Sequence, residues 1–175
     1  MDEIIDMVDE ITGKKIGKTI SKNEAHKRGI WHSAIHILII NKDKTKVLLQ
    51  KRCEQKKLYP NIWDISVGGH ISTNEEPLTS AKRELQEELG LNPDNYEFIF
   101  LEKVKEELNN NIIKSKEFVY TYLISSDIDL KDIKVQKEEV SEVKWVTKEE
   151  LNNLINDSKL IPHQKVYKIL NKTLK

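Results

Sequence analysis

Three glutamates near the middle of the chain have a spacing that could hold a metal ion. Glu84, Glu87 and Glu88 stand at positions i, i+3 and i+4, so on a helix their carboxylates share one face. Magnesium takes oxygen ligands of this kind, together with phosphate oxygens of a substrate. The spacing is compatible with a magnesium site, although an acidic cluster alone is usually a solvent-exposed helix face.

The residues around these glutamates predict the helix that positions them. Pro77 suits the first helical position, and Gly90 suits the left-handed residue that follows the last turn. Arg83 lies one turn before Glu87, so it can pair with that carboxylate and orient it. Before the helix, the flexible backbone at Gly69 allows close approach to a ligand, and its carbonyl is a candidate metal ligand.

The stretch from Gly69 to Leu91 reads G-x5-E-x7-R-E-L-x-E-E-x-G-L and resembles the signature of the Nudix hydrolases. Every specified position is filled, namely by Gly69, Glu75, Arg83, Glu84, Leu85, Glu87, Glu88, Gly90 and Leu91. The resemblance implies the Nudix fold and cleavage of a diphosphate linked to another group, with Mg²⁺ or Mn²⁺ as cofactor.

Carried onto this chain, the same resemblance implies the roles of individual residues. Glu84, Glu87 and Glu88 would bind the metal, with Glu84 as the general base and Arg83 orienting it. Glu75 would tether the loop to the helix. The identity of the base stays open, because in many Nudix enzymes a glutamate outside the signature does this work.

Residues outside the signature are candidates for the base and for substrate binding. Glu138 and Glu139 precede a predicted strand, and either could serve as the base. Lys51 and Arg52 begin a lysine-rich loop that could contact a phosphate, although a solvated loop is the simpler interpretation. We predict Lys51, Arg52 and Glu139 as substrate-binding residues.

A finer resemblance concerns the histidines. His26, His32 and His70, with Glu117, resemble the Nudix branch that includes the type I isopentenyl-diphosphate isomerases. In those isomerases three histidines and two glutamates bind a second metal, which implies a second metal site here. Independent packing roles for each histidine are the alternative.

Two residues depart from the isomerase pattern. Gly68 replaces the cysteine that takes part in proton transfer, and Ser115 occupies the position of the second glutamate. Without a thiol at Gly68, no acid or base stands there to move a proton on an alkene. We therefore predict a hydrolase of this branch that acts on a nucleoside diphosphate linked to another moiety. The alternatives are isopentenyl-diphosphate isomerase and a non-catalytic nucleotide-binding Nudix module.

Composition narrows the class of protein. The chain has 175 residues, 38% of them hydrophobic and 33% charged, as expected for a single domain over residues 1–175. Lysine and arginine number 29, as do aspartate and glutamate, so no overall field attracts a long nucleic acid. The single Cys53 excludes an internal disulfide.

The chain has no apolar run of membrane-spanning length and no signal-peptide pattern. We therefore expect a cytoplasmic enzyme with a small-molecule substrate. Whether it forms a homodimer stays open.

The hydrophobic pattern predicts a mixed sheet with helices on both sides, in agreement with the α/β/α sandwich that the resemblance implies. A hairpin is expected over residues 1–20, a turn over Leu108–Asn111, and helices over Lys22–Arg28 and Pro77–Leu89, after Thr147, and from Pro162 onward. The expected strands are His32–Asn41, Lys46–Lys51, Ile62–Val67, Tyr96–Lys105, Glu117–Ser125 and Val140–Val146.

Overall fold

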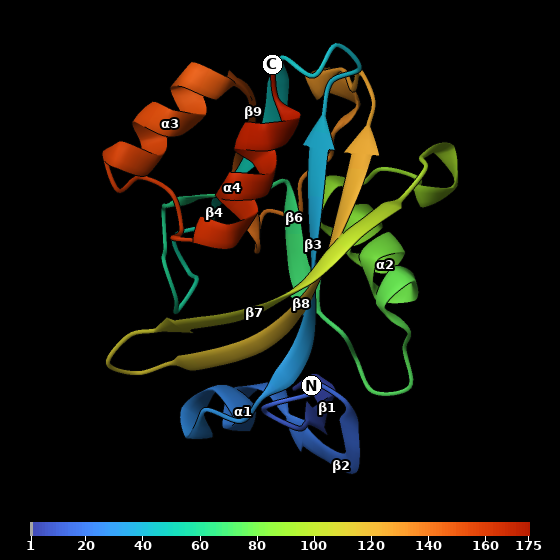
Figure 1. The fold of residues 1–175 in the computed structure, drawn as a ribbon, viewed down its shortest axis with the longest axis vertical. Coiled ribbons are helices and arrows are strands. Elements are labelled where there is room, and N and C mark those ends of the chain that lie inside the picture. Colours follow the sequence, from blue (N-terminus) through green and yellow to red (C-terminus); the bar gives the residue numbers. More distant parts are fainter. Residues whose placement is uncertain (1) are drawn as a thin grey trace.

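A computed structural model describes residues 2–175, in which a mixed β-sheet is covered by helices (Figure 1). The strands are β1 (Ile4–Val8), β2 (Lys15–Ser21), β3 (His32–Ile40), β4 (Lys46–Arg52), β5 (Trp63–Asp64), β6 (Val67–His70), β7 (Ile99–Asn109), β8 (Lys114–Ser125) and β9 (Val140–Thr147). The α-helices are α1 (Lys22–Arg28), α2 (Pro77–Leu89), α3 (Lys148–Asn156) and α4 (Gln164–Thr173). This arrangement confirms the predicted α/β class.

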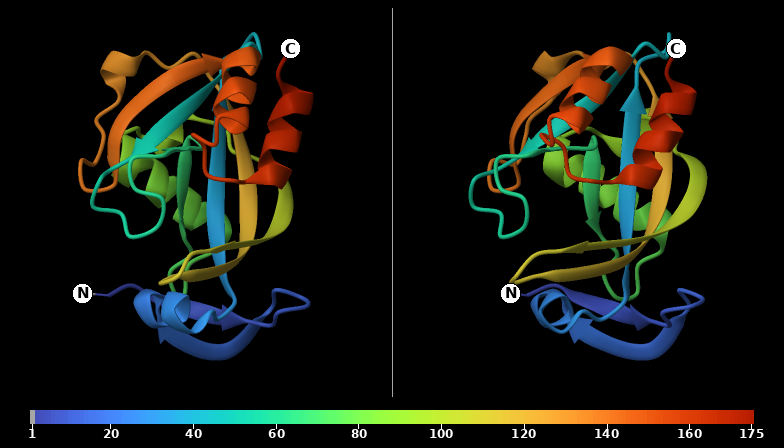
Figure 2. Two further views of the ribbon diagram at one scale, coloured as in Figure 1. Left: turned by 90° about the vertical axis from the view of Figure 1, so that its left-hand side faces the viewer. Right: turned by 60° about the vertical axis from the view of Figure 1, so that its left-hand side comes forward.

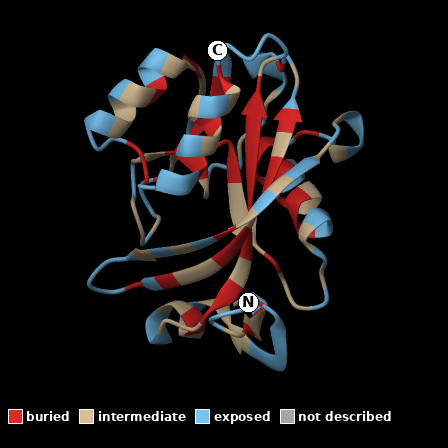
Figure 3. Ribbon diagram, viewed as in Figure 1, coloured by how far each residue is buried: buried red, intermediate tan, exposed pale blue. Residues whose placement is uncertain are grey.

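Strand β3 forms the centre of the sheet, antiparallel to β6 and parallel to β8. Its side chains alternate between two buried faces, as expected for a central strand covered on both sides. Ile35, Ile37 and Ile39 pack toward α2, whereas Leu38 and Ile40 pack toward α3 and α4. The strands are buried where they cross the middle of the molecule (Figure 3), and the N-terminal hairpin lies with α1 at one end (Figure 2).

The predicted strand Ile62–Val67 is wrong, because the chain changes partner strand inside it. β5 pairs with β4, and β6 pairs with β3. At the crossing, the hydroxyl of Ser66 accepts a hydrogen bond from the Ile39 amide at 2.8 Å and donates one to the Leu48 carbonyl at 2.6 Å. This buried side chain supplies hydrogen bonds between β3 and β4 where the ladder is interrupted.

The predicted boundaries of two further strands, of the turn between them and of the last helix are also wrong. Strand β7 begins at Ile99 rather than Tyr96 and continues to Asn109, and β8 begins at Lys114 rather than Glu117. The turn between them therefore lies at residues 110–113, two residues later than expected. Two runs of charged residues, Glu102–Lys103 and Lys105–Glu107, interrupt the apolar pattern of β7, which concealed where the strand ends. The last helix begins at Gln164 rather than Pro162, because the intervening His163 has a non-helical ψ of 62°.

We expect Ser66→Ala to lower the free energy of unfolding by about 1–3 kcal/mol, because the Ile39 amide loses its buried partner. Urea unfolding followed by circular dichroism measures the change. Ser141→Ala is the matched control, since the Ser141 hydroxyl also donates to a strand carbonyl, that of Lys51, but is exposed. Equal stability of the two variants would contradict the importance of the buried crossing.

Candidate active site

A cavity of about 450 Å³ opens between α2 and the divergent ends of β3 and β4. Pairing between β3 and β4 is recorded at Ile40 and Val47, and β5 and β6 flank the space beyond that point. The cavity has the size of a small-molecule site. Its walls combine the three predicted glutamates, His26 and His70 with basic residues of the loop that follows β4.

Helix α2 presents the three glutamates to this cavity. It begins at Pro77 and is followed by Gly90, with φ 66°, so both predicted ends are confirmed. Its apolar residues Ala81, Leu85 and Leu89 pack against the sheet. This orientation buries Glu84 and Glu88 at the cavity wall, whereas the Glu87 side chain remains 51% exposed.

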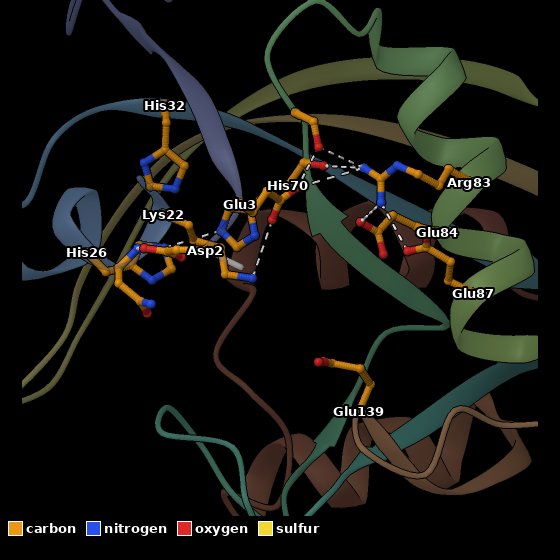
Figure 4. Close-up of polar contacts among 12 residues, drawn as sticks. Asp2, Glu3, Lys22, His26, His32, His70, Arg83, Glu84, Glu87 and Glu139 are labelled. Carbon is orange, nitrogen blue, oxygen red and sulfur yellow. Dashed lines mark hydrogen bonds and ion pairs between the residues drawn. The ribbon is translucent and has the colours of Figure 1, made fainter. Parts of the chain in front are cut away.

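Arg83 connects α2 with the loop that precedes it (Figure 4). Its guanidinium donates to Glu84 Oε1 at 2.7 Å, to Glu87 Oε2 at 3.1 Å and to Glu75 Oε2 at 3.0 Å. It also donates to the His70 carbonyl at 3.2 Å. The expected pairing of Arg83 with the glutamates is present, and Glu75 lies between loop and helix as predicted.

The backbone at Gly69 lies against the carboxylate of Glu84. A Cβ atom at this position would overlap the Glu84 side chain. At Gly68, by contrast, the nearest neighbour of an added Cβ would be His36 Cδ2 at 3.5 Å, an ordinary contact. Only Gly69 is therefore required by close packing, and this closeness places its backbone next to the glutamate cluster.

Burial makes two of the glutamates weak acids. Burial raises the pKa of Glu84 to about 7 against the opposing effect of Arg83. Burial and the charge of Glu84 raise the pKa of Glu88 to about 8. Glu88 accepts a hydrogen bond from Gln50 Nε2 at 3.0 Å. A divalent cation bound beside these two carboxylates would lower their pKa values and so favour the ionised form.

The predicted substrate-binding residues occupy different positions. Arg52 lines the cavity and contacts Asp64 Oδ2 at 3.5 Å. Glu139 also lines it and forms an ion pair with Lys56. Lys51 points to the other face of β4, where its Nζ lies 6.0 Å from the centre of the Trp63 ring, so its placement does not support the predicted phosphate contact.

Two further residues from the sequence analysis lie nearby. The carbonyl of Glu138 accepts a hydrogen bond from the buried Cys53 thiol, with Sγ and oxygen 2.8 Å apart. This contact fixes the turn that carries Glu139 beside the loop after β4.

The structure brings the four residues of the predicted second metal site together. One ligand atom from each of His26, His32, His70 and Glu117 lies within 4.8 Å of the others. Glu117 Oε1 lies 3.8, 3.4 and 3.4 Å from the Nε2 atoms of the three histidines in that order. Ser115 donates to the same carboxylate at 2.6 Å, so the residue replacing the second glutamate joins this cluster.

Sequence reasoning missed Asp64 and His163, which line the cavity, and Gln50 and Glu106, which contact residues of its wall. All four are buried or nearly so. They come from β4, β5, β7 and the segment before α4. Each stands alone in the sequence without a motif, so only the scarcity of histidine in the chain could have drawn attention to His163.

The comparisons with known proteins agree with this architecture. A family model described as NUDIX domain matches residues 31–167. Over its whole length, the structure resembles a solved protein of Deinococcus radiodurans, with a TM-score of 0.75 and 20% identity, covering 99% of this chain and 100% of that one. The chain therefore belongs to the NUDIX domain family.

Two sequence relatives indicate the branch of the family. Nudix hydrolase 3 of Arabidopsis thaliana is 39% identical over 158 residues, which cover 87% of this chain but 20% of that longer protein. Isopentenyl-diphosphate Delta-isomerase of Dinoroseobacter shibae is 32% identical, covering 77% of this chain and 74% of the relative. The predicted resemblance to a Nudix branch that contains both hydrolases and isomerases is confirmed. Among its described helices, none has the length and apolar character that crossing a membrane requires.

We expect Gly69→Ala to lower the free energy of unfolding by about 1–3 kcal/mol, because the added methyl group overlaps Glu84. The matched control Gly68→Ala should be neutral or slightly stabilising, since its methyl group has room. Urea unfolding of both variants measures the difference. A larger loss at Gly68 would show that the packing at the two glycines has been misjudged.

The raised pKa values of Glu84 and Glu88 predict how stability depends on pH. Unfolded glutamates lose their protons near 4.5, whereas these two keep them to about 7 and about 8. In chelator, the folded state binds more protons across this window, so the free energy of unfolding should fall as pH rises through it. Magnesium should raise the melting temperature more at the upper end of the window than at the lower end. An equal effect of magnesium at both ends would contradict this prediction.

Proposed function

We propose that this protein is a magnesium-dependent hydrolase that cleaves the diphosphate linkage of a nucleoside diphosphate joined to another moiety. The observation that carries the proposal is the placement of Glu84 and Glu88, buried on one face of α2 at the cavity wall beside Glu87. Among the described residues, Arg83 is the positively charged side chain that donates hydrogen bonds to Glu84 and Glu87. It also donates to Glu75.

The donor set fits magnesium rather than a softer metal. The carboxylates of Glu84, Glu87 and Glu88 and the carbonyl of Gly69 are oxygen ligands, which hard cations prefer. When bound, Mg²⁺ would neutralise charge on the phosphate oxygens and lower the pKa of an attacking water; Mn²⁺ could replace it.

The side chains around this set have separate roles in the proposed reaction. Arg83 holds Glu84 and Glu87 in place from one side. Glu84, which a bound metal would keep ionised, accepts a proton from the attacking water. Across the cavity, Arg52 and Lys56 offer positive charge to the diphosphate. Glu139 holds Lys56 through their ion pair, which makes Glu139 a positioning residue in this proposal.

The residue at position 68 favours hydrolysis over isomerisation. Gly68 offers no acid or base next to His36, although its surroundings would accept a small side chain. Moving a double bond needs a proton donor and acceptor on the carbon skeleton, whereas hydrolysis needs only activated water. The absent thiol therefore supports the hydrolase over the isomerase.

The isomerase remains the second candidate because of the assembled histidine cluster. His26, His32, His70 and Glu117 converge as they would around a transition metal, which imidazole ligands suit. The name of the Dinoroseobacter relative points in the same direction. We propose that this cluster can bind a second metal in either case, so it does not by itself separate the two reactions.

We expect Glu88→Gln to lower turnover about a hundredfold or more, since a buried carboxylate that holds the metal is lost. The test is a ³¹P NMR panel with magnesium over nucleoside triphosphates, ADP-ribose, dinucleotide cofactors, nucleotide sugars and isopentenyl diphosphate. Glu102→Gln, an exposed glutamate of β7, is the matched control and should retain wild-type rates.

The other outcomes of this panel decide against the proposal. Turnover that is undiminished in excess chelator would exclude the magnesium mechanism. Isomerised isopentenyl diphosphate without cleavage would establish the second candidate. Tight binding without turnover on any substrate would indicate a non-catalytic nucleotide-binding module.

A further inference from the structure

Another cluster of metal-ligating side chains lies on the face of β3 that is turned toward α4. It consists of His36 from β3, Glu106 from β7 and His163 from the residue before α4. One ligand atom from each of the three lies within 4.8 Å of the others. None of these residues belongs to the glutamate cluster of α2 or to the histidine cluster around Glu117.

The imidazole of His163 is held between two carboxylates. Its Nδ1 lies 2.7 Å from Glu106 Oε2, and its Nε2 lies 3.0 Å from Asp64 Oδ1. His163 and Asp64 are both about 5% exposed or less. Asp64 is itself fixed by the Ile65 amide at 2.8 Å and by Arg52 at 3.5 Å. The ring of His163 is thus oriented from the Asp64 side, with Nδ1 directed toward Glu106.

His36 contributes a buried polar atom that the fold leaves without a partner. It is 5% exposed, and its Nδ1 has no hydrogen-bond partner among the described residues. Its ring centre lies 4.6 Å from that of His163. Thr121, which is paired with His36 in the parallel ladder, likewise has an unpartnered hydroxyl within the described chain. Such atoms cost free energy unless a ligand or water satisfies them.

We propose that His36, Glu106 and His163 bind a divalent transition metal ion of the zinc class, with Asp64 orienting His163. Two imidazoles and one carboxylate form a ligand set typical of zinc sites that keep a position open for water or substrate. A carboxylate that accepts the second N–H of a metal-binding histidine is the usual outer partner. The contact between His163 Nε2 and Asp64 supplies this partner.

The surroundings leave access to the proposed ion. His36 and His163 both line the cavity that also contains Glu84 and Glu88. Gly68 is paired with His36 across β3 and β6 and has no side chain to cover it. The open coordination position would therefore face the cavity, on the other side of β6 from the α2 glutamates. The nearly buried carboxylates of Asp64 and Glu106, of which Asp64 also contacts Arg52, offer negative charge to a divalent ion.

The competing explanation is a metal-free ion pair. In that arrangement His163 keeps protons on both nitrogens and donates to Glu106 and Asp64. Burial opposes this charge, but the two carboxylates outweigh it and raise the pKa of His163 to about 10. A bound metal would replace the Nδ1 proton, while the Nε2 proton to Asp64 would remain. The two states therefore differ at one identifiable atom.

The first experiment counts and locates the metal. The full-length variant His26→Gln/His70→Gln disables the other histidine cluster, and excess Mg²⁺ occupies the glutamates. After titration with Co²⁺ or Zn²⁺ and gel filtration, elemental analysis should find one equivalent bound, and Co²⁺ should show visible absorption. Glu106→Gln in this background should abolish binding, and Asp64→Asn should weaken it about 10–100-fold. Glu107→Gln, the exposed neighbour on β7, is the matched control and should bind normally.

The second experiment needs no substitution at the site. In ¹⁵N-labelled protein with Mg²⁺, Zn²⁺ should shift a ring nitrogen of His36 and remove the Nδ1 proton of His163 while the Nε2 proton persists. Three results would overturn the proposal. They are no stoichiometric metal in the background variant, equal binding by Glu106→Gln and Glu107→Gln, or a His163 ring that keeps both protons in the presence of Zn²⁺.

Discussion

The guanidinium of Arg83 is the interaction on which the geometry of the α2 cluster depends. It joins Glu75 of the loop, the His70 carbonyl at the end of β6 and two glutamates of its own helix. A planar group with several donors can fix such partners simultaneously, which a lysine could not do. Because the same group contacts helix, loop and strand, the positions of Glu84, Gly69 and the cavity wall are set together.

Several buried carboxylates lie in and around the cavity, and those of Glu84 and Glu88 are not fully compensated by positive charge. Glu84 and Glu88 keep raised pKa values despite Arg83 and Gln50. On the other side of β6, Asp64 and Glu106 share His163. Burying carboxylates costs free energy unless they are paired, and ionisable groups with shifted pKa values gather at functional sites. Divalent cations are the ligands that best fit both locations, though the two donor sets differ. Oxygen ligands on α2 suit magnesium, whereas imidazoles beyond β6 suit a softer ion.

The contrast between these clusters explains what the sequence could predict. Glu84, Glu87 and Glu88 lie within two turns of one helix, so helical spacing alone places them together, and Pro77 and Gly90 mark the helix ends. His36, Asp64, Glu106 and His163 are separated by long stretches of chain and converge only because β3, β5 and β7 meet the segment before α4. The strand predicted over Ile62–Val67 failed for a related reason. A local apolar pattern cannot reveal that the chain exchanges β4 for β3 as its partner at Ser66.

The two adjacent glycines of β6 differ in the space around them, and this difference bears on the reaction. Gly69 is required, because Glu84 occupies the space that a side chain would need. Gly68 has no such constraint, since a Cβ there would meet His36 at an ordinary distance. The space around position 68 therefore accepts a Cβ atom, and glycine is not imposed there by packing. The branch that this chain resembles places its proton-transferring thiol there, whereas this chain leaves the position open to the cavity. With glycine instead of a thiol at position 68, the site lacks a group for proton transfer to carbon. This supports the proposed attack by water on a phosphate.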